Sequence, residues 1–356
     1  MKEHDTPREA VSLKGPAFAL VAALLFGAST PLAKVILVHI HPVMLAGVLY
    51  LGSGLGLFVY SRFRRELVEV PLGPKDWLWF APAILCGGIL GPIFLLVGLR
   101  ATSASFASLL LILEGVFTAL IAWIAFREHF HIRIGIGMAA ITIGAAVLAW
   151  QGQFSPGNVV GPLLIVLACL AWAADNNFTR KVALCDPVQI AMIKGLVAGS
   201  VNLVLSYFWG VLSFDPLLIA AGGLIGFMSY GVGLVLFVLA LRAVGSARTA
   251  AYYSIAPFMG ASIAVLLLGE PFTLQLALAA WLMGFGVWLH LTEHHEHPHD
   301  HMLLKHSHSH NHDLHHQHEH GSGDPVGEPH VHAHVHRPMR HTHSHFPDPH
   351  HSHGHG

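Results

Sequence analysis

The chain has 356 residues, of which 54% are hydrophobic and only 11% are charged, and its mean hydropathy is +0.58. Soluble domains carry about 25% charged residues, so this composition excludes an ordinary soluble protein and is typical of a membrane protein. The net charge of −1 says nothing about partners, because the charges are confined to loops and chain ends. The three cysteines have unrelated spacings, which predicts neither a disulfide framework nor a zinc site.

The predicted membrane spans begin after a polar N-terminal arm, residues 1–15. The first apolar run, Pro16–Val38, is long enough for the roughly 20 helical residues that cross about 30 Å of hydrocarbon. It exceeds the core of a signal peptide and many spans follow it, so we expect it to be retained. The further predicted spans are Val43–Tyr60, Trp77–Leu99, Thr102–Ala125, Ile132–Trp150, Val159–Ala174, Val188–Trp209, Pro216–Leu241, Ala247–Leu268 and Leu274–His290.

The ten predicted spans fall into two related halves, 16–150 and 159–291, joined by a short linker at 151–158. The stretch Gly91–Phe130 returns in altered form at Gly233–Phe272, where Arg242 corresponds to Arg100 at an offset of 142 residues. Self-similarity at a long fixed period indicates that one half was duplicated.

The positive charges of the loops predict the orientation of the spans. With the N-terminus in the cytoplasm, the inside segments hold most of the basic residues, whereas Arg100 lies outside and Lys34 lies near the outer end of the first span. Both termini are therefore predicted to be cytoplasmic. Because each half has an odd number of spans, the second half is expected to be upside down relative to the first, as in the inverted repeats of secondary transporters.

The composition changes abruptly after the last span. Residues 292–356 contain 24 histidines among Ser, Pro, Gly, Glu and Asp, with few aliphatic residues. A segment of this kind buries too little apolar surface to offset its chain entropy, which predicts a disordered cytoplasmic tail.

At this point the chain resembles a known family. The two five-span halves, the proline in the middle of the first span at Pro31, and the arginine-bearing turns at Arg100 and Arg242 resemble the drug/metabolite transporter superfamily. So do the ends of spans four and nine, Arg127-Glu128 and Gly269-Glu270-Pro271, and the closest likeness is to the EamA-type ten-helix members. The resemblance covers residues 16–291. It implies an all-α integral membrane protein that moves a small metabolite by alternating access, with a central cavity between its halves.

Glu114 is the first candidate for a functional residue inside a span. A carboxylate at the middle of a span costs at least about 2.5 kcal/mol to insert, and such groups usually face a cavity or a partner. Its position suits proton coupling or cation binding, and the alternative is a neutral Glu that hydrogen-bonds to a neighbouring helix. The corresponding residue of the second half is Ala256, so the two halves differ in charge at this depth.

Other polar and helix-breaking residues in the spans complete the candidate site. Asp175 and Asn176 in span six correspond roughly to Ser29 and Thr30 in span one, and at least one of them is expected to face the cavity. Lys194 lies about two turns into span seven, where it could pair with Asp175 or Glu114, bind a substrate carboxylate, or extend to the membrane interface. Candidates beside these positions are Pro31 and Pro257, since helix breaks free backbone carbonyls, and Tyr253.

The tail carries imidazoles at alternate positions, which is a pattern suited to transition metals. Neutral imidazole is a ligand for Zn²⁺, Ni²⁺, Co²⁺ and Cu²⁺, and a flexible chain can gather several imidazoles around one ion. The alternatives are a tail without function and a pH sensor. The candidate ligands are His306, His308, His310, His312, His330, His332, His334, His336, His341, His343 and His345.

The sequence as a whole predicts a multi-pass transporter of a bacterial inner membrane rather than an enzyme, since no nucleophile–base pair or phosphate loop is present. We expect it to move a small organic metabolite, with no required cofactor, lipid as its surroundings, no nucleic-acid partner and a homodimer as an open alternative. The competing hypotheses are an exporter of divalent transition metal, with His39 and His41 on the outer side, and a membrane-anchored metal store or sensor.

Overall fold

A computed structural model describes residues 14–63, 71–126, 132–150, 156–182, 185–292, 296–301, 304–310, 330–336 and 339–344. Most of the N-terminal arm, the Arg127-Glu128 motif, much of the 151–158 linker, and the candidate ligands His312 and His345 lie outside these residues.

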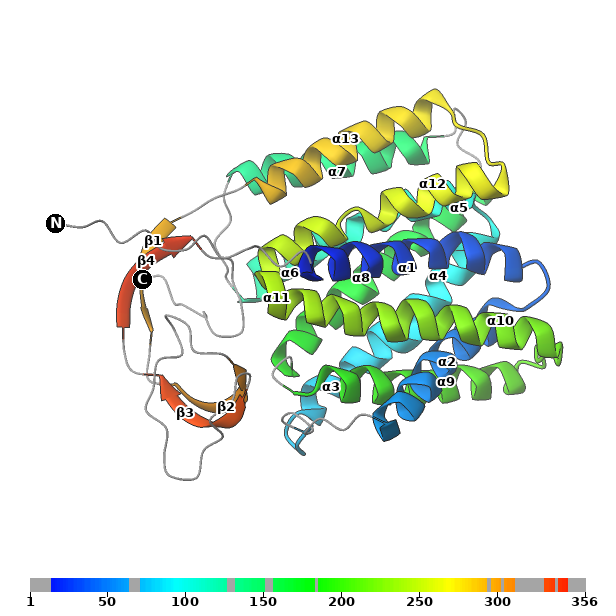
Figure 1. Ribbon diagram of the computed structural model, residues 1–356. Helices are drawn as coiled ribbons and strands as arrows, with labels where there is room; N and C mark the ends of the chain where they lie inside the picture. Colours follow the sequence, from blue (N-terminus) through cyan, green and yellow to red (C-terminus); the bar gives the residue numbers. More distant parts are fainter. Residues whose placement is uncertain are drawn as a thin grey trace.

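Between residues 14 and 292 every described regular element is a helix, as the sequence predicts (Figure 1). The elements are α1 (Lys14–Ile36), α2 (Pro42–Phe63), α3 (Trp77–Ala83), η1 (Ile84–Leu90), α4 (Gly91–Arg100), α5 (Ala104–Leu110), α6 (Leu113–Phe126), α7 (Ile132–Ala149), α8 (Pro156–Thr179), η2 (Arg180–Val182), α9 (Pro187–Phe208), α10 (Pro216–Gly226), η3 (Phe227–Val232), α11 (Gly233–Tyr253), α12 (Ala256–Leu268) and α13 (Leu274–Leu291).

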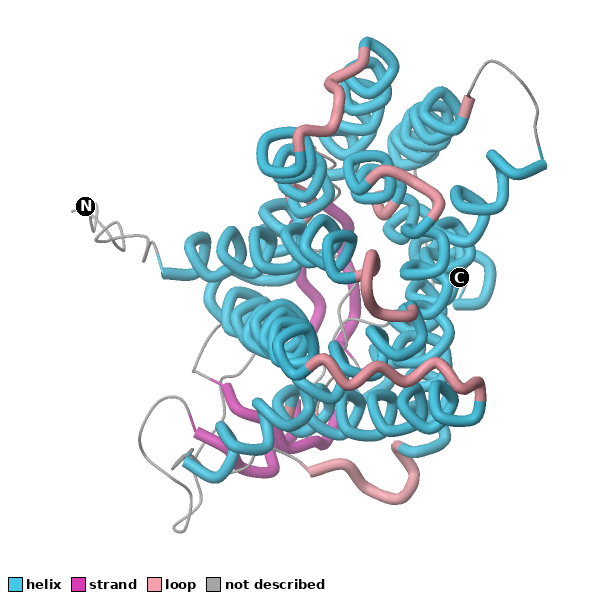
Figure 2. Tube along the Cα trace, turned by 90° about the vertical axis from the view of Figure 1, so that its right-hand side faces the viewer, coloured by secondary structure: helices cyan, strands magenta, loops and turns pink. Residues whose placement is uncertain are grey.

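The described helices have the length and composition of a multi-pass membrane protein. Seven helical stretches are long and apolar enough to cross a membrane, and three shorter apolar helices accompany them, Ile132–Leu148, Ala256–Leu268 and Leu274–Leu289. The start of α1 and the end of α13 lie at the same end of the bundle, which we call the terminal end (Figure 1). The opposite end, the distal end, carries the loops at 37–41, 101–103, 209–215 and 269–273, seen end-on in Figure 2.

The same helix irregularities occur in both halves of the chain. Two π-helical segments, η1 and η3, interrupt the spans that begin with α3 and α10, and they lie about one repeat offset apart. Two breaks follow, at residues 111–112 between α5 and α6 and at residues 254–255 between α11 and α12. The matching positions of these four departures from α-helix support the duplication inferred from the sequence.

The second break corrects one predicted boundary. The sequence predicts that span eight ends at Leu241 and that span nine begins at Ala247, but α11 continues as one helix through this region to Tyr253. The segment ends instead just before Pro257, which is at the first turn of α12. A proline lacks the N–H that would continue the preceding helix and fits best in a first turn, which is consistent with a break just before Pro257.

The distal loops begin their helices with side-chain caps. Ser103, Asp215 and Thr273 each accept a hydrogen bond from a backbone N–H in the first turn of α5, α10 and α13, respectively. Gly269 ends α12 with a φ of 68°, a left-handed conformation that glycine adopts without a steric penalty.

Helices of the first half pack mainly against helices of the second half. The pairs are α2 with α9, α7 with α13, α1 with α11 and α12, and α4 and α6 with α8. Small residues bring several of these helices into backbone contact. A Cβ on Gly52 would overlap the backbone of Gly223, and a Cβ on Gly54 would overlap that of Gly195 and Leu196.

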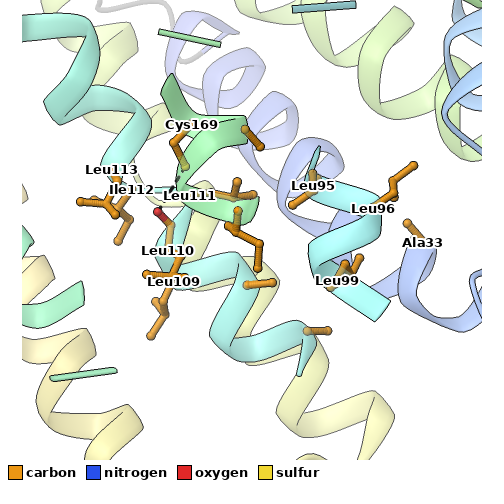
Figure 3. Close-up of a cluster of buried hydrophobic side chains, with 14 of the residues drawn as sticks. Ala33, Leu95, Leu96, Leu99, Leu109, Leu110, Leu111, Ile112, Leu113 and Cys169 are labelled. Atoms are coloured by element: carbon orange, nitrogen blue, oxygen red, sulfur yellow. Dashed lines mark hydrogen bonds between the residues drawn. The ribbon is translucent and has the colours of Figure 1, made fainter. Parts of the chain in front are cut away.

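The largest cluster of buried apolar side chains among the described residues reaches from the middle of the bundle to its distal end, and Figure 3 shows part of it. It joins the last turns of α1 and α4 with α5 and with α8, and Leu99, Leu109 and Leu110 are at most 1% exposed within it. Two smaller clusters lie around α9, where Phe80 and Leu57 are buried. Apolar side chains of both halves therefore pack together in the distal part of the bundle.

The structure differs from the predicted disorder of the tail. Two two-stranded antiparallel sheets occur there, with β1 (Glu296–His301) paired to β4 (Met339–Ser344) and β2 (Leu304–His310) paired to β3 (His330–His336). Every second residue of β2 and β3 is a histidine, and such a period of two residues favours an extended ladder once two such segments meet. The expected all-helical membrane part is thus confirmed, and the structure departs from the expected disorder only at these strands of the tail.

Candidate functional site

An ion pair between Asp175 of α8 and Lys194 of α9 lies inside the second half. The Lys194 ammonium donates hydrogen bonds to both carboxylate oxygens, at 2.6 and 2.5 Å, and Thr179 donates to the same carboxylate at 2.9 Å. Asp175 is only 6% exposed. Of the roles expected for Lys194, the structure therefore shows pairing with Asp175, which satisfies two charges that would be unfavourable alone in a membrane.

The π-helical segment η1 packs directly against this pair. A Cβ on Gly87 would overlap the Asp175 carboxylate, so only glycine fits there without displacing the acid. A π-helical turn leaves a carbonyl without its usual helical donor. The Gly87 carbonyl accepts hydrogen bonds from the Tyr50 hydroxyl at 2.6 Å and from the Trp172 indole at 2.9 Å, which satisfies it within the membrane region.

Glu114 connects the two halves at the break between α5 and α6. Its Oε1 accepts a hydrogen bond from the Asn176 amide at 2.8 Å, and Asn176 also lies 3.4 Å from the Thr118 hydroxyl. The break places Glu114 in the first turn of α6, where the unpaired N–H groups of a helix favour a carboxylate. Among the described residues, Glu114 makes no ion pair and its second oxygen has no hydrogen-bond donor.

Aromatic rings from both halves lie beside these polar groups. Tyr50 stacks on Tyr230 with ring centroids 5.3 Å apart, and Phe26 contacts Tyr230 and Tyr253 at 5.9 and 5.7 Å. Tyr50 links these rings to the polar groups, because its hydroxyl binds the Gly87 carbonyl and Gly87 packs against the Asp175 carboxylate. The spans therefore contain a mixed aromatic and acidic site between the halves.

The predicted site residues of span one, Ser29, Thr30 and Pro31, lie beside the break between α11 and α12. They make no described hydrogen bond to Glu114 or Asp175. Ser29 donates to the Phe26 carbonyl at 2.6 Å, and both Ser29 and Thr30 are 3% exposed. Pro31 lies inside α1, which remains helical through it. A Cβ on the neighbouring Gly27 would overlap the backbone of Ala256 and Gly260, so this part of α1 contacts the helix that Pro257 begins.

Two charged residues hold the loop that joins α4 to α5 at the distal end. Lys34 at the end of α1 donates to the carbonyls of Leu99 and Thr102 at 2.6 and 2.7 Å. Glu270 of the second half accepts from the backbone N–H groups of Ala104 and Ser105 at 2.6 and 2.8 Å. We call Lys34, Glu270 and residues 99–105 the distal clamp; Lys34, expected to set topology, thus binds backbone as well.

The histidines of the α1–α2 loop form no metal site with other described side chains. His41 Nδ1 accepts from the Val43 N–H at 3.4 Å, where α2 begins. Desolvation, followed by the positive charge of Arg100, lowers the pKa of His41 from its ordinary value. Within the described ranges, no three His, Cys, Asp or Glu side chains lie close enough together to hold a metal ion.

Sequence reasoning found the acidic and amide residues of the site but missed its aromatic and backbone parts. It did not identify Phe26, Tyr50, Trp172 and Tyr230, or the carbonyl of Gly87. One signal was available: Tyr50 and Tyr230 carry hydroxyl groups in the middle of apolar runs, and a buried phenol needs a partner.

Known proteins resemble this chain along most of its length. The sequence profile described as the EamA-like transporter family matches residues 13–150 and again residues 159–292. An uncharacterized transporter of Methanothermobacter thermautotrophicus is 27% identical over 287 residues, which are 76% of this chain and 84% of that protein. The uncharacterized transporter YvbV of Bacillus subtilis is 23% identical over 71% of this chain and 83% of its own length.

A further relative and a solved structure agree with this result. An uncharacterized transporter of Archaeoglobus fulgidus is 24% identical over 77% of this chain and 96% of its own. A crystal structure covers 77% of this chain and 95% of its own with a TM-score of 0.53 at 17% identity, which shows a shared fold alone. With two profile matches that together span most of its residues, and with membrane-spanning helices throughout both, the chain belongs to the EamA-like transporter family and is a multi-pass membrane transporter.

Proposed function

We propose that the protein exports a small organic metabolite by alternating access, using the site around Glu114 between its two halves. The observation that carries this proposal is the hydrogen bond from Asn176 to Glu114, which joins the two halves at the break between α5 and α6. A polar site held by both halves changes its exposure when one half rotates against the other, which is how repeat-built transporters work.

The proposal includes ten spans in two inverted halves of five, 16–150 and 159–291, with both termini in the cytoplasm of a bacterial cell. Packing across the two halves supports it. Helix α1 of the first half packs on α11 and α12 of the second half, and α8 of the second half packs on α5 and α6 of the first half. The basic residues of the loops support the orientation, which makes the distal end the outer one.

The experiment compares cells that express the full chain, the Glu114→Gln variant and an Asp215→Asn control whose carboxylate only caps α10. Untargeted measurement of solutes inside and outside the cells gives the readout. We expect the full chain and the control to lower the cellular level of at least one organic solute, and Glu114→Gln to abolish this change. Unchanged transport by Glu114→Gln would remove this residue from the mechanism.

The second part of the proposal is that the tail binds transition metal ions. In the β2–β3 pair, His306, His308 and His310 lie opposite His334, His332 and His330 in the register. In the β1–β4 pair, His299 and His297 lie opposite His341 and His343. Histidine is the commonest metal ligand among side chains, and paired strands bring residues of distant sequence together.

The zinc, nickel and cobalt contents of the same cells, and of cells that express a chain ending at Thr292, distinguish the competing functions. We expect the amount of retained metal to fall when the tail is removed and to stay unchanged in the Glu114→Gln variant. If cell metal instead falls with the full chain and not with Glu114→Gln, the cargo is metal. If metal follows the tail and no organic solute changes, the protein is a membrane-anchored store.

A further inference from the structure

We propose that the site between the halves selects an organic monocation, a solute with one positively charged nitrogen on an apolar or aromatic body. This inference rests on the transport function proposed above and adds the charge and shape of the cargo. Three features of the described residues carry it: an acid without a counter-ion, a base that is already occupied, and a group of aromatic rings beside the ion pair of that base.

The first feature is the unbalanced charge of Glu114. Its described hydrogen-bond partner is the neutral amide of Asn176, and one carboxylate oxygen has no donor. The second acid of the site, Asp175, is already neutralised by Lys194. When Glu114 is ionised, the described polar groups of the site carry one net negative charge, and a cationic solute would supply the partner that a carboxylate in a membrane requires.

The second feature is the engagement of Lys194, which disfavours anions and zwitterions. Both oxygens of Asp175 bind the ammonium, at 2.6 and 2.5 Å, and Gly87 packs against the same carboxylate. A substrate carboxylate would have to displace Asp175 from this ammonium and leave the acid unpaired. An amino acid would therefore find a partner for its amine at Glu114 but none for its carboxylate.

The third feature is the ring cluster of Phe26, Tyr50, Tyr230 and Tyr253, in which Tyr50 binds the Gly87 carbonyl beside the Asp175 carboxylate. Aromatic faces attract a cation by their quadrupole and attract apolar groups by burial. Amide, phenol and ring partners suit an organic ammonium group better than a transition-metal ion, whose preferred nitrogen and sulfur ligands are not gathered among the described residues. The combination favours an aromatic or aliphatic amine over a metal ion.

The test uses the full chain reconstituted in liposomes and two scaffolds that differ only in charge. The first set is phenethylamine, phenylalanine and 3-phenylpropionate, and the second is hexylamine, norleucine and hexanoate, each radiolabelled. Binding and Glu114-dependent transport are measured for every compound. We expect the amine of at least one set to bind about tenfold more tightly than its zwitterion and its anion, the ratio that about 1.4 kcal/mol produces.

Charge variants make the expectation specific. Glu114→Gln should weaken amine binding roughly tenfold, whereas Glu114→Asp, which keeps the charge and reports on folding, should retain most of it. Asp175→Asn frees Lys194, so the preference should move from the amine toward the zwitterion. A purely structural ion pair would change the stability of the protein without changing this preference.

The outcomes separate the inference from the function on which it rests. Tighter binding and Glu114-dependent transport of phenylalanine or norleucine would overturn the monocation class and leave the transport site in place. Amine binding that is unaffected by Glu114→Gln would overturn the site for this cargo. If no compound binds and the expressed chain changes no cellular solute, both the inference and the proposed function are wrong.

Discussion

The role of each charged residue in the spans depends on the groups that it contacts rather than on its residue type. Lys34, Lys194 and Glu270 are charged residues at the ends or in the interior of spans. The structure gives each of them a partner: backbone carbonyls for Lys34, Asp175 for Lys194, and backbone N–H groups for Glu270. In each case the partner lies outside the residue's own helix, so the role follows from packing.

Cys185 offers a test at this scale, because it lies between the spans at the terminal end. Burial, followed by the negative charge of Asp76, raises the pKa of the Cys185 thiol to about 11. Thiolate is the reactive form, so at pH 8 this cysteine should react with iodoacetamide about a hundredfold more slowly than an ordinary thiol. The measurement is the alkylation rate from pH 7 to 11 in a chain with Cys86→Ala and Cys169→Ala.

The reaction rate should continue to rise above pH 10 rather than level off near pH 9. Asp76→Asn keeps the acceptor for the Gly73 N–H but removes the negative charge, so it should move the rise to lower pH. A profile that levels off near pH 9 in both chains would contradict the raised pKa.

The π-helical segments show how a whole element serves the site. The η1 segment exposes the Gly87 carbonyl to Tyr50 and Trp172, and the Gly88 carbonyl accepts from Asn202 at 3.1 Å. An α-helix would use these carbonyls internally. The irregular turn therefore lets α2, α8 and α9 bind one point of the third span.

Gly87→Ala tests this element. The added methyl group would overlap the Asp175 carboxylate and separate it from Lys194, so we expect a loss of about 1–3 kcal/mol of stability and a loss of transport. Gly115→Ala is the matched control, since a Cβ at Gly115 meets no atom within 4 Å. That variant should be neutral or stabilise the helix by up to about 1 kcal/mol. Thermal unfolding in detergent measures both; equal melting temperatures would contradict the close packing.

At the scale of the whole molecule, the contacts at the distal end indicate which state of the transport cycle the structure represents. The apolar cluster and the distal clamp hold helices of both halves together at the end opposite the termini. A transporter that alternates must break such contacts to open at that end. We expect the structure to represent the form that is closed at the distal side.

Glu270→Ala should shift the population toward the form open at the distal side. The variant loses two hydrogen bonds to a charged group, and a net change of about 1.4 kcal/mol would shift the equilibrium roughly tenfold. Ser108 is 1% exposed beneath the clamp, so a thiol introduced by Ser108→Cys in a chain without native cysteines reports opening to an impermeant reagent.

Asp215→Ala is the control for this measurement, because Asp215 caps α10 within its own half and crosses to no other helix. Labelling from the distal side should increase with Glu270→Ala and stay unchanged with Asp215→Ala. Equal labelling of both variants would show that Glu270 only stabilises the helix.

The sequence alone was enough for the class of the protein. Apolar runs of membrane length, repeated at a fixed offset, predicted an all-helical membrane protein, and the motifs of the chain resembled the EamA-type transporters. The helices and the family profile confirm these two expectations. The polar residues that are unfavourable in lipid also identified Glu114, Asp175 and Lys194, because a membrane makes such groups conspicuous in any sequence. The count of ten spans, their inverted orientation and the metal-binding role of the tail stay predictions.

Only the tertiary structure decided which groups meet. Hydropathy measures the free energy of transferring a segment into lipid. It therefore does not reveal the π-helical turns or the break before Pro257, because these change the pattern of backbone hydrogen bonds and not the polarity of the side chains. It also cannot show that Lys194 chooses Asp175 and leaves Glu114 with an amide, since that choice depends on which helices pack together. For the tail, composition predicted disorder, whereas the structure pairs segments in which histidine alternates with other residues into strands. Such pairing depends on a second segment distant in sequence, which no local pattern reveals.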